Sequence, residues 1–245
     1  STATKSETAF KNMFDSLDQL STYFSGTKRH AKLMELQKEM RPDKQLSELA
    51  NSSATRWISW STSTEKVLNL YYVLLHALRH FQEDRDGETR MQAYGLYGLM
   101  HNKQFLFLLV AFNRVFQVVS QATIALQKPS LSCDMVWDIL CVSKQCLKEF
   151  RDNDSSGYNK TIELTEELVT KNKVPDLPQS SRVTQLPKHL HSYTVTQSCG
   201  GRGDSGEKNA NGIFRKLWYS LLDSLLGELD ARFGSEQKGI MICVD

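Results

Sequence analysis

The stretch STEKVLNLYYVLLHAL, residues 63–78, decides the fold class of this chain. Its apolar residues recur at intervals of three and four, which is the period of an amphipathic α-helix rather than a strand. They are Val67, Leu70, Tyr71, Leu74, Leu75 and Leu78. Thr64 and Glu65 stand at the front, where polar and acidic residues favour a helix N-terminus. We therefore predict a long helix that begins near Ser63 and ends before the polar turn at Asp84–Gly87.

The same period continues toward the N-terminus. One helix is predicted around residues 10–25, with Phe10, Met13, Phe14, Leu17 and Leu20 on its apolar side. A second is predicted over residues 28–40, and Pro42 ends it because proline lacks an N–H and crowds the preceding turn. A short helix at residues 46–50 and a turn at 51–53 complete this part.

Toward the C-terminus the pattern predicts helices over residues 88–101, 105–126, 135–150 and 161–170. Ser132 and Asp134 are candidate caps for the third of these. Residues 171–211 are rich in Pro, Gly, Ser and Gln, so they bury too little apolar surface to offset the entropy of ordering. We interpret them as a flexible polar loop with one short strand at residues 193–195. A last helix is expected from Ile213, and residues 239–244 are expected to form a strand or a truncated end.

Composition sets further bounds. The chain has 245 residues, of which 40% are hydrophobic, and its formal net charge of +2 does not by itself indicate a nucleic-acid partner. The longest apolar run, Phe105–Phe112, is too short to cross a bilayer, so no membrane partner is predicted. Five scattered cysteines without a CxxC pair favour a reduced intracellular compartment. Cys133 and Cys141 flank Trp137, and we expect both to be buried small hydrophobes.

Four stretches carry a family resemblance. They are YFSGTKRH at residues 23–30, TRW at 55–57, the apolar region 95–150, and FRKLWYSLLDSLLGELDARF at 214–233. In this order they resemble the interior of hAT-family transposases, including zinc finger MYM-type protein 1-like chains. One departure is that no Arg follows the Thr-Arg-Trp motif within a few residues.

The resemblance implies a fold and an organisation. Members of the family have a ribonuclease H-like catalytic fold interrupted by a large helical insertion. The expected fold is therefore mainly α, the helical insertion domain of a hAT transposase-like protein that is incomplete at both ends. Its expected segments are 1–62, helical and leading to the Thr-Arg-Trp motif; 63–170, the helical insertion bundle; 171–212, the flexible polar loop; and 213–245, a helix that returns toward the truncated ribonuclease H-like domain.

The resemblance also bears on catalysis. Complete members are expected to bind Mg²⁺ through two Asp and one Glu, which activate water or a DNA hydroxyl. No residue of this chain matches any of the three, so we predict no catalytic residue, no metal ligand and no cofactor in it. Asp223 and Glu228 are five apart on a helix and point roughly 140° from each other. His76 and His80 have the spacing of a zinc-binding pair, but the Glu of the HExxH motif is missing.

Nucleic-acid contact is the open question. Lys28, Arg29, Lys32, Arg56 and Trp57 are the candidate nucleic-acid-binding residues, because cations bind phosphates and Trp stacks on bases. The alternative is that the interleaved acidic residues Glu35, Glu39 and Asp43 neutralise this surface and that Trp57 anchors the core.

The sequence thus predicts a nuclear, catalytically incomplete, transposon-derived protein that is a DNA-associated or protein-interaction module. Its expected partners are DNA, and other proteins or a second copy through regions outside this chain. One alternative is a fragment of an active hAT DNA transposase. Another is a helical adaptor that binds proteins through exposed faces such as Leu217, Trp218 and Leu221.

Overall fold

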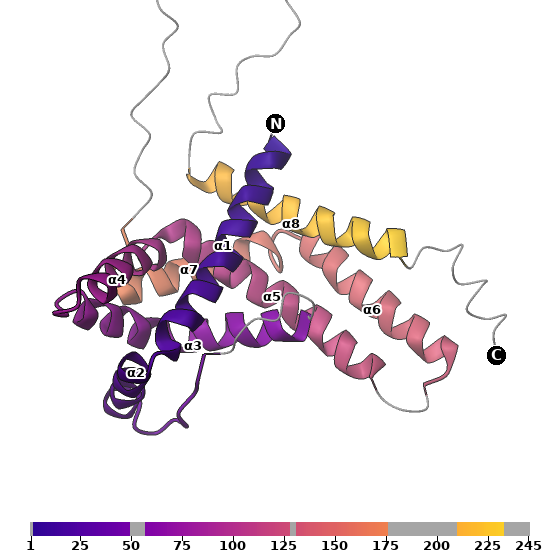
Figure 1. Ribbon diagram of the computed structural model, residues 1–245. Helices are drawn as coiled ribbons and strands as arrows, with labels where there is room; N and C mark the ends of the chain where they lie inside the picture. Colours follow the sequence, from indigo (N-terminus) through magenta and orange to yellow (C-terminus); the bar gives the residue numbers. More distant parts are fainter. Residues whose placement is uncertain (1, 50–56, 128–130, 176–209, 233–245) are drawn as a thin grey trace, which may run out of the picture.

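The computed structural model describes residues 2–49, 57–127, 131–175 and 210–232, and within these ranges it contains eight α-helices and no strand (Figure 1). The helices are α1 (Thr2–Ser25), α2 (Thr27–Met40), α3 (Trp57–Phe81), α4 (Gly87–Met100), α5 (Lys103–Leu126), α6 (Cys133–Asp152), α7 (Tyr158–Asn172) and α8 (Ala210–Arg232). The mainly α prediction is confirmed. The expected strands at 193–195 and 239–244 lie outside the described residues.

Helix α5 is the centre of the bundle. It packs against α3, α6 and α7, and residues 105–112 are all buried. Among the described residues, α5 is the helix that is long and apolar enough, by these two measures, to span a bilayer. Most of its apolar stretch is buried against other helices, which is the arrangement of a core helix in a helical bundle.

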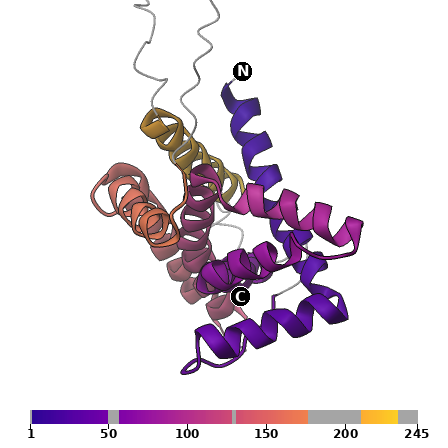
Figure 2. The ribbon, with the colours of Figure 1, turned by 90° about the vertical axis from the view of Figure 1, so that its left-hand side faces the viewer.

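Helix α8 is the last described helix of the bundle. It packs along α6 and also contacts α1 and α5, as Figures 1 and 2 show. Phe214, Trp218 and Leu222 are fully buried, and the ring of Phe214 stacks on that of Phe107 with centroids 4.7 Å apart. Trp218 Nε1 donates to the Phe150 carbonyl at 3.3 Å, which satisfies its polar atom.

A half-buried arginine, Arg114, connects α5 to the turn between α6 and α7. The Arg114 guanidinium donates to the carbonyls of Ser156 at 2.5 Å and Gly157 at 2.7 Å, and to the hydroxyl of Thr161. It also lies 4.7 Å from the centroid of the Phe150 ring, a cation–π contact. Burial lowers the pKa of Arg114, although the group remains charged at any physiological pH.

The predicted helix at residues 46–50 is wrong over its described residues, and the predicted start of α3 is wrong. Residues 46–49 are not helical, because the Gln37 side chain donates to the Ser47 carbonyl and accepts from the Ser47 N–H, each at 2.9 Å. These bonds use the backbone groups that a helix would need. Helix α3 begins at Trp57, six positions earlier than predicted. Ser132 is confirmed as the cap of α6, since its hydroxyl accepts from Met135 N.

Candidate functional site

Lys28, the first of the predicted basic residues, is ion-paired within the protein. Its Nζ lies 2.6 Å from the Asp84 carboxylate in the turn between α3 and α4. The side chain of Asp84 is only 7% exposed, whereas that of Lys28 is 72% exposed. The hydrogen bond from Lys28 holds the pKa of Asp84 below its ordinary value. Lys28 therefore joins α2 to this turn.

Arg29 directs its donors inward. Its Nε donates to the Tyr23 carbonyl at 2.5 Å, and its Nη1 donates to the Thr89 hydroxyl at 3.3 Å. The guanidinium also lies 4.6 Å from the centroid of the Tyr23 ring. Burial raises the pKa of Tyr23 to about 12, so this ring stays neutral. Arg29 is thus part of the packing between α1, α2 and α4.

The remaining predicted residues are only partly described. Lys32 pairs with Glu35 one turn later, at 3.1 Å. Arg56 lies outside the described residues, and Trp57 begins α3 with a side chain that is not described. The structure therefore brings Lys28, Arg29 and Lys32 together on α2, each with a partner inside the protein.

The candidate metal-binding residues do not converge. Within the described ranges, no group of three His, Cys, Asp or Glu side chains could hold an ion. Asp223 instead accepts from Arg151 at 2.6 Å, as a salt bridge between α6 and α8. His76 lies against Tyr72, and His80 lies against Phe81.

Two expectations about exposure are overturned. Cys141 is exposed rather than buried, and it borders a small hollow of about 40 Å³ between α6 and α8. The side chain of Cys133 is not described. Leu217, Trp218 and Leu221 are at most 5% exposed, since α8 packs them into the core. These three residues therefore offer no face to a partner.

Three of the exposed large apolar side chains lie on α4, and the others are spread over other parts of the chain, as with Met135 and Val142 on α6. Met91 is 72% exposed, Tyr94 is 58% exposed and Leu99 is 45% exposed. Gly95 and Gly98 lie among them, and a methyl group added at either would meet nothing within 4 Å. We call Met91, Tyr94, Gly95, Gly98 and Leu99 the α4 outer face. The opposite side of the same helix packs into the core through Ala93, Leu96 and Met100.

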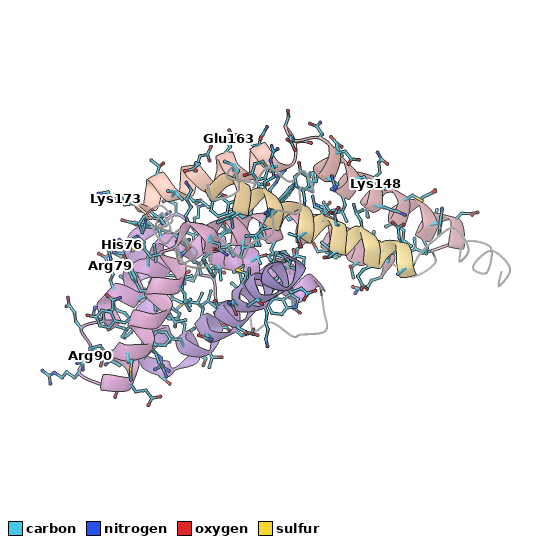
Figure 3. The ribbon with its side chains drawn as sticks, turned by 90° about the horizontal axis from the view of Figure 1, so that it is seen from above. His76, Arg79, Arg90, Lys148, Glu163 and Lys173 are labelled. Carbon is cyan, nitrogen blue, oxygen red and sulfur yellow. The ribbon has the colours of Figure 1, made fainter. Side chains whose placement is uncertain are left out.

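A basic rim borders the α4 outer face. Arg79 on α3 donates from Nε to the Tyr97 hydroxyl at 2.9 Å, and its guanidinium lies 5.2 Å from the centroid of the Tyr97 ring. The His101 ring also stacks on the Tyr97 ring, and the two ring centroids are 5.0 Å apart. Arg90 is exposed near the start of α4. Figure 3 shows Arg90 and Arg79 at the same edge of the molecule, and we call these two residues the basic rim.

Sequence reasoning missed this surface although a signal for it was present. The sequence of α4, GETRMQAYGLYGLM, places apolar residues on every side of the helix. A helix that contacts the core through one face needs only one apolar stripe. Apolar residues on every side of a helix therefore indicate that a second face also packs against another surface.

A further hollow, of about 400 Å³, lies between α1, α2 and the segment before Leu49. It is lined by Ser21, Phe24, Ser25, Thr27, His30, Leu33, Glu48 and Leu49. His30 Nε2 lies 3.5 Å from the Glu48 carboxylate across it. The lining is mixed and open to solvent, without a set of convergent polar groups.

Comparison with known protein families, with curated proteins and with solved structures finds no match to this chain. Its function is therefore argued from its own residues and contacts.

Proposed function

We propose that this chain is a non-catalytic, transposon-derived helical module that binds other proteins in the nucleus. We also propose that it descends from the helical insertion of a hAT-like transposase, on the strength of the four ordered stretches that resemble that family. The observation that carries the binding role is the α4 outer face, because it is apolar and exposed on a helix whose other side already packs into the core.

The energetics favour such a role. Fully burying an exposed Leu or Met side chain contributes roughly 1.5–3 kcal/mol. The three large residues of this face are 45–72% exposed, so covering what remains of them contributes a few kcal/mol together. Association costs at least about 4 kcal/mol in lost translational and rotational freedom. The face alone therefore supports a weak complex, and contacts from its rim would strengthen it.

DNA association through α2 is the second candidate function. It is favoured by the 72% exposure of the Lys28 side chain, which leaves this cation within reach of a phosphate. Against it, Lys28, Arg29 and Lys32 already have partners inside the protein, which a phosphate would have to displace. Protein binding requires no such exchange.

The test compares three forms of the purified chain. They are the native chain, a Met91→Lys/Leu99→Lys variant, and a Lys148→Ala control on the exposed surface of α6. Each is used to capture proteins from a nuclear extract, with quantification by mass spectrometry. The proposal expects a set of proteins that the native chain and the control retain and the double variant loses. Capture that is identical for all three forms would contradict it.

The same forms are titrated with a mixed-sequence DNA duplex at two salt concentrations, with a Lys28→Ala/Lys32→Ala variant alongside. The protein-binding role expects little affinity for DNA. Binding that weakens with salt and with the α2 substitutions would favour the second candidate, because counterion release from DNA drives binding and becomes less favourable as the salt concentration rises. Magnesium-dependent cleavage of DNA by a longer product containing this chain would favour a fragment of an active transposase.

A further inference from the structure

We infer that the α4 outer face binds an amphipathic helix of a partner protein, and that the flank of this helix facing the basic rim is acidic. The inference rests on the proposed function and adds the shape and charge of the partner.

The shape of the face fits a helix. At about 100° per residue, Met91, Gly95 and Gly98 fall within one narrow stripe along α4, with Tyr94 and Leu99 on either side. The two glycines form a shallow valley, because neither has a side chain and no other residue fills the space above them. A ridge of side chains on a second helix fits such a valley at the usual spacing of 8–10 Å between helix axes. An extended peptide would gain no backbone hydrogen bonds here, since those of α4 are made within the helix.

The positive charge of the basic rim favours a partner helix with acidic residues on the facing flank. Arg90, Tyr94, Tyr97 and His101 follow one another at intervals of four, three and four along one side of α4, and Arg79 joins them through Tyr97. Within the part of the chain that the structure describes, neither Arg79 nor Arg90 has a salt-bridge partner. Some of the cations that connect helices elsewhere have a carboxylate partner, as in the pairs Lys103–Glu166 and Arg151–Asp223. A carboxylate on the partner would complete the rim with a charge-assisted bond.

Nucleic acid fits this surface less well. Binding of DNA or RNA depends on several cations that neutralise neighbouring phosphates, and the rim offers two arginines. The centre of the face is apolar and its other flank carries Glu88, held by Gln92 at 3.1 Å. A phosphate placed there would meet the Glu88 carboxylate and no cation that neutralises it.

A second copy of the chain also fits less well. If two α4 helices packed antiparallel about a twofold axis, each flank would lie against the same flank of the other copy. The basic rims would then face each other, and like charges across an interface disfavour the pair.

The test is a selection from displayed helical peptides with a fixed leucine and alanine face and randomised flanking positions. The inference expects Asp and Glu to be enriched on one flank. It also expects the dissociation constant of the selected peptides to rise at least tenfold with Met91→Lys and with Arg79→Glu/Arg90→Glu, and by less than twofold with the control Lys148→Glu. Replacing the acidic residues of the peptide by Lys should restore binding to the Arg79→Glu/Arg90→Glu variant.

Other outcomes overturn the inference in distinguishable ways. If the selected helices lack an acidic flank but bind the native chain and fail to bind Met91→Lys, the inferred charge of the partner is wrong. The proposed protein-binding function would still hold. Recovery of no helix, or of helices indifferent to Met91→Lys, would overturn both. A dimer in light scattering that Met91→Lys abolishes would assign the face to a second copy, and duplex binding lost with Arg79→Glu/Arg90→Glu would assign it to nucleic acid. Circular dichroism and urea unfolding of each variant confirm that it is folded.

Discussion

The Thr161 hydroxyl on α7 accepts a hydrogen bond from the Arg114 guanidinium on α5, and so joins two helices across 47 residues of sequence. Ser156 and Gly157 complete the set of acceptors around this cation, and the rings of Phe150 and Trp218 lie beside it. One side chain therefore holds α5, α7 and α8 in register.

Arg114→Ala should lower the free energy of unfolding by about 1–3 kcal/mol, because it removes the donor to the Ser156 carbonyl and leaves a void beside the rings of Phe150 and Trp218. Arg114→Lys should recover only part of the loss, since an ammonium cannot reproduce the planar fork. Urea unfolding followed by circular dichroism measures both. The exposed Lys148→Ala is the control, expected to change stability by less than about 0.5 kcal/mol. Equal midpoints for Arg114→Ala and this control would contradict the role of Arg114.

Two glycines should respond to alanine in opposite directions. A Cβ at Gly157 would stand 2.0 Å from the Phe150 carbonyl oxygen, so the backbone of the turn must move and Gly157→Ala should be strongly destabilising. A Cβ at Gly95 meets nothing, and alanine is the better helix former, so Gly95→Ala should stabilise the chain by about 0.5–1 kcal/mol. Thermal unfolding of the two variants side by side checks the contrast, which fails if both shift the midpoint the same way.

The core contact between α5 and α8 should be costly to remove. Phe214 is fully buried and stacks on Phe107, so Phe214→Ala loses both the transfer free energy and the packing around a cavity. We expect a loss of about 3–5 kcal/mol, measured by urea unfolding. Ile213→Ala, one position earlier and 40% exposed, is the matched control and should have a much smaller effect.

Acid should weaken the contact between α2 and the α3–α4 turn. Hydrogen bonds to the carboxylates lower the pKa values of Asp84 and Asp86 from 3.8, with Lys28 the main donor to the first and Thr89 to the second. A carboxyl whose pKa is lower in the folded state contributes stability above its unfolded pKa and loses it as pH falls through the folded value. The free energy of unfolding should therefore decline below about pH 4. Asp84→Asn should show a shallower decline over this range, and a slope unchanged from the native chain would contradict the assignment.

Alkali should weaken the packing of α1 around Tyr23. Burial raises the pKa of Tyr23 from 10.0 to about 12, so its contribution is complete below pH 10 and is lost as pH rises toward 12. Tyr23→Phe removes this titration and should flatten the loss of stability between these pH values. The ultraviolet absorbance of tyrosinate in the folded chain gives an independent reading: ionisation of every tyrosine near pH 10 would contradict it.

The helices were predictable because their apolar residues repeat strongly. The Leu70–Leu74 period and the Ser132 cap are local properties of the sequence, and the structure contains both. The start of α3 was missed because the residues after Trp57 are mostly Ser and Thr, which favour turns in isolation. In the folded chain the Thr64 hydroxyl donates to the Trp60 carbonyl within α3, and the Ser61 hydroxyl donates to Ser120 on α5, a partner 59 residues away that no local pattern shows.

The role of the predicted basic residues is decided by the side chains and backbone groups that they contact, and not by their spacing in the sequence. The run Lys28-Arg29-His30 is visible in the sequence, but its partners Asp84 and Thr89 stand 56 and 60 residues away. No local pattern shows that they meet. The excess of apolar residues in α4 is visible, yet which of its faces joins the core is decided by packing against α3 and α1.

The docking of α8 has a consequence for synthesis of the chain. Phe214 and Trp218 fill a space bounded by Phe107 and Phe150, which leave the ribosome well before them. A nascent chain that has emerged only as far as Asn172 exposes these apolar rings to solvent, and transiently exposed apolar surface is prone to aggregation. Completion of the core therefore waits on translation of the last described helix, and co-translational chaperone contact should be greatest in the interval between Asn172 and Ala210.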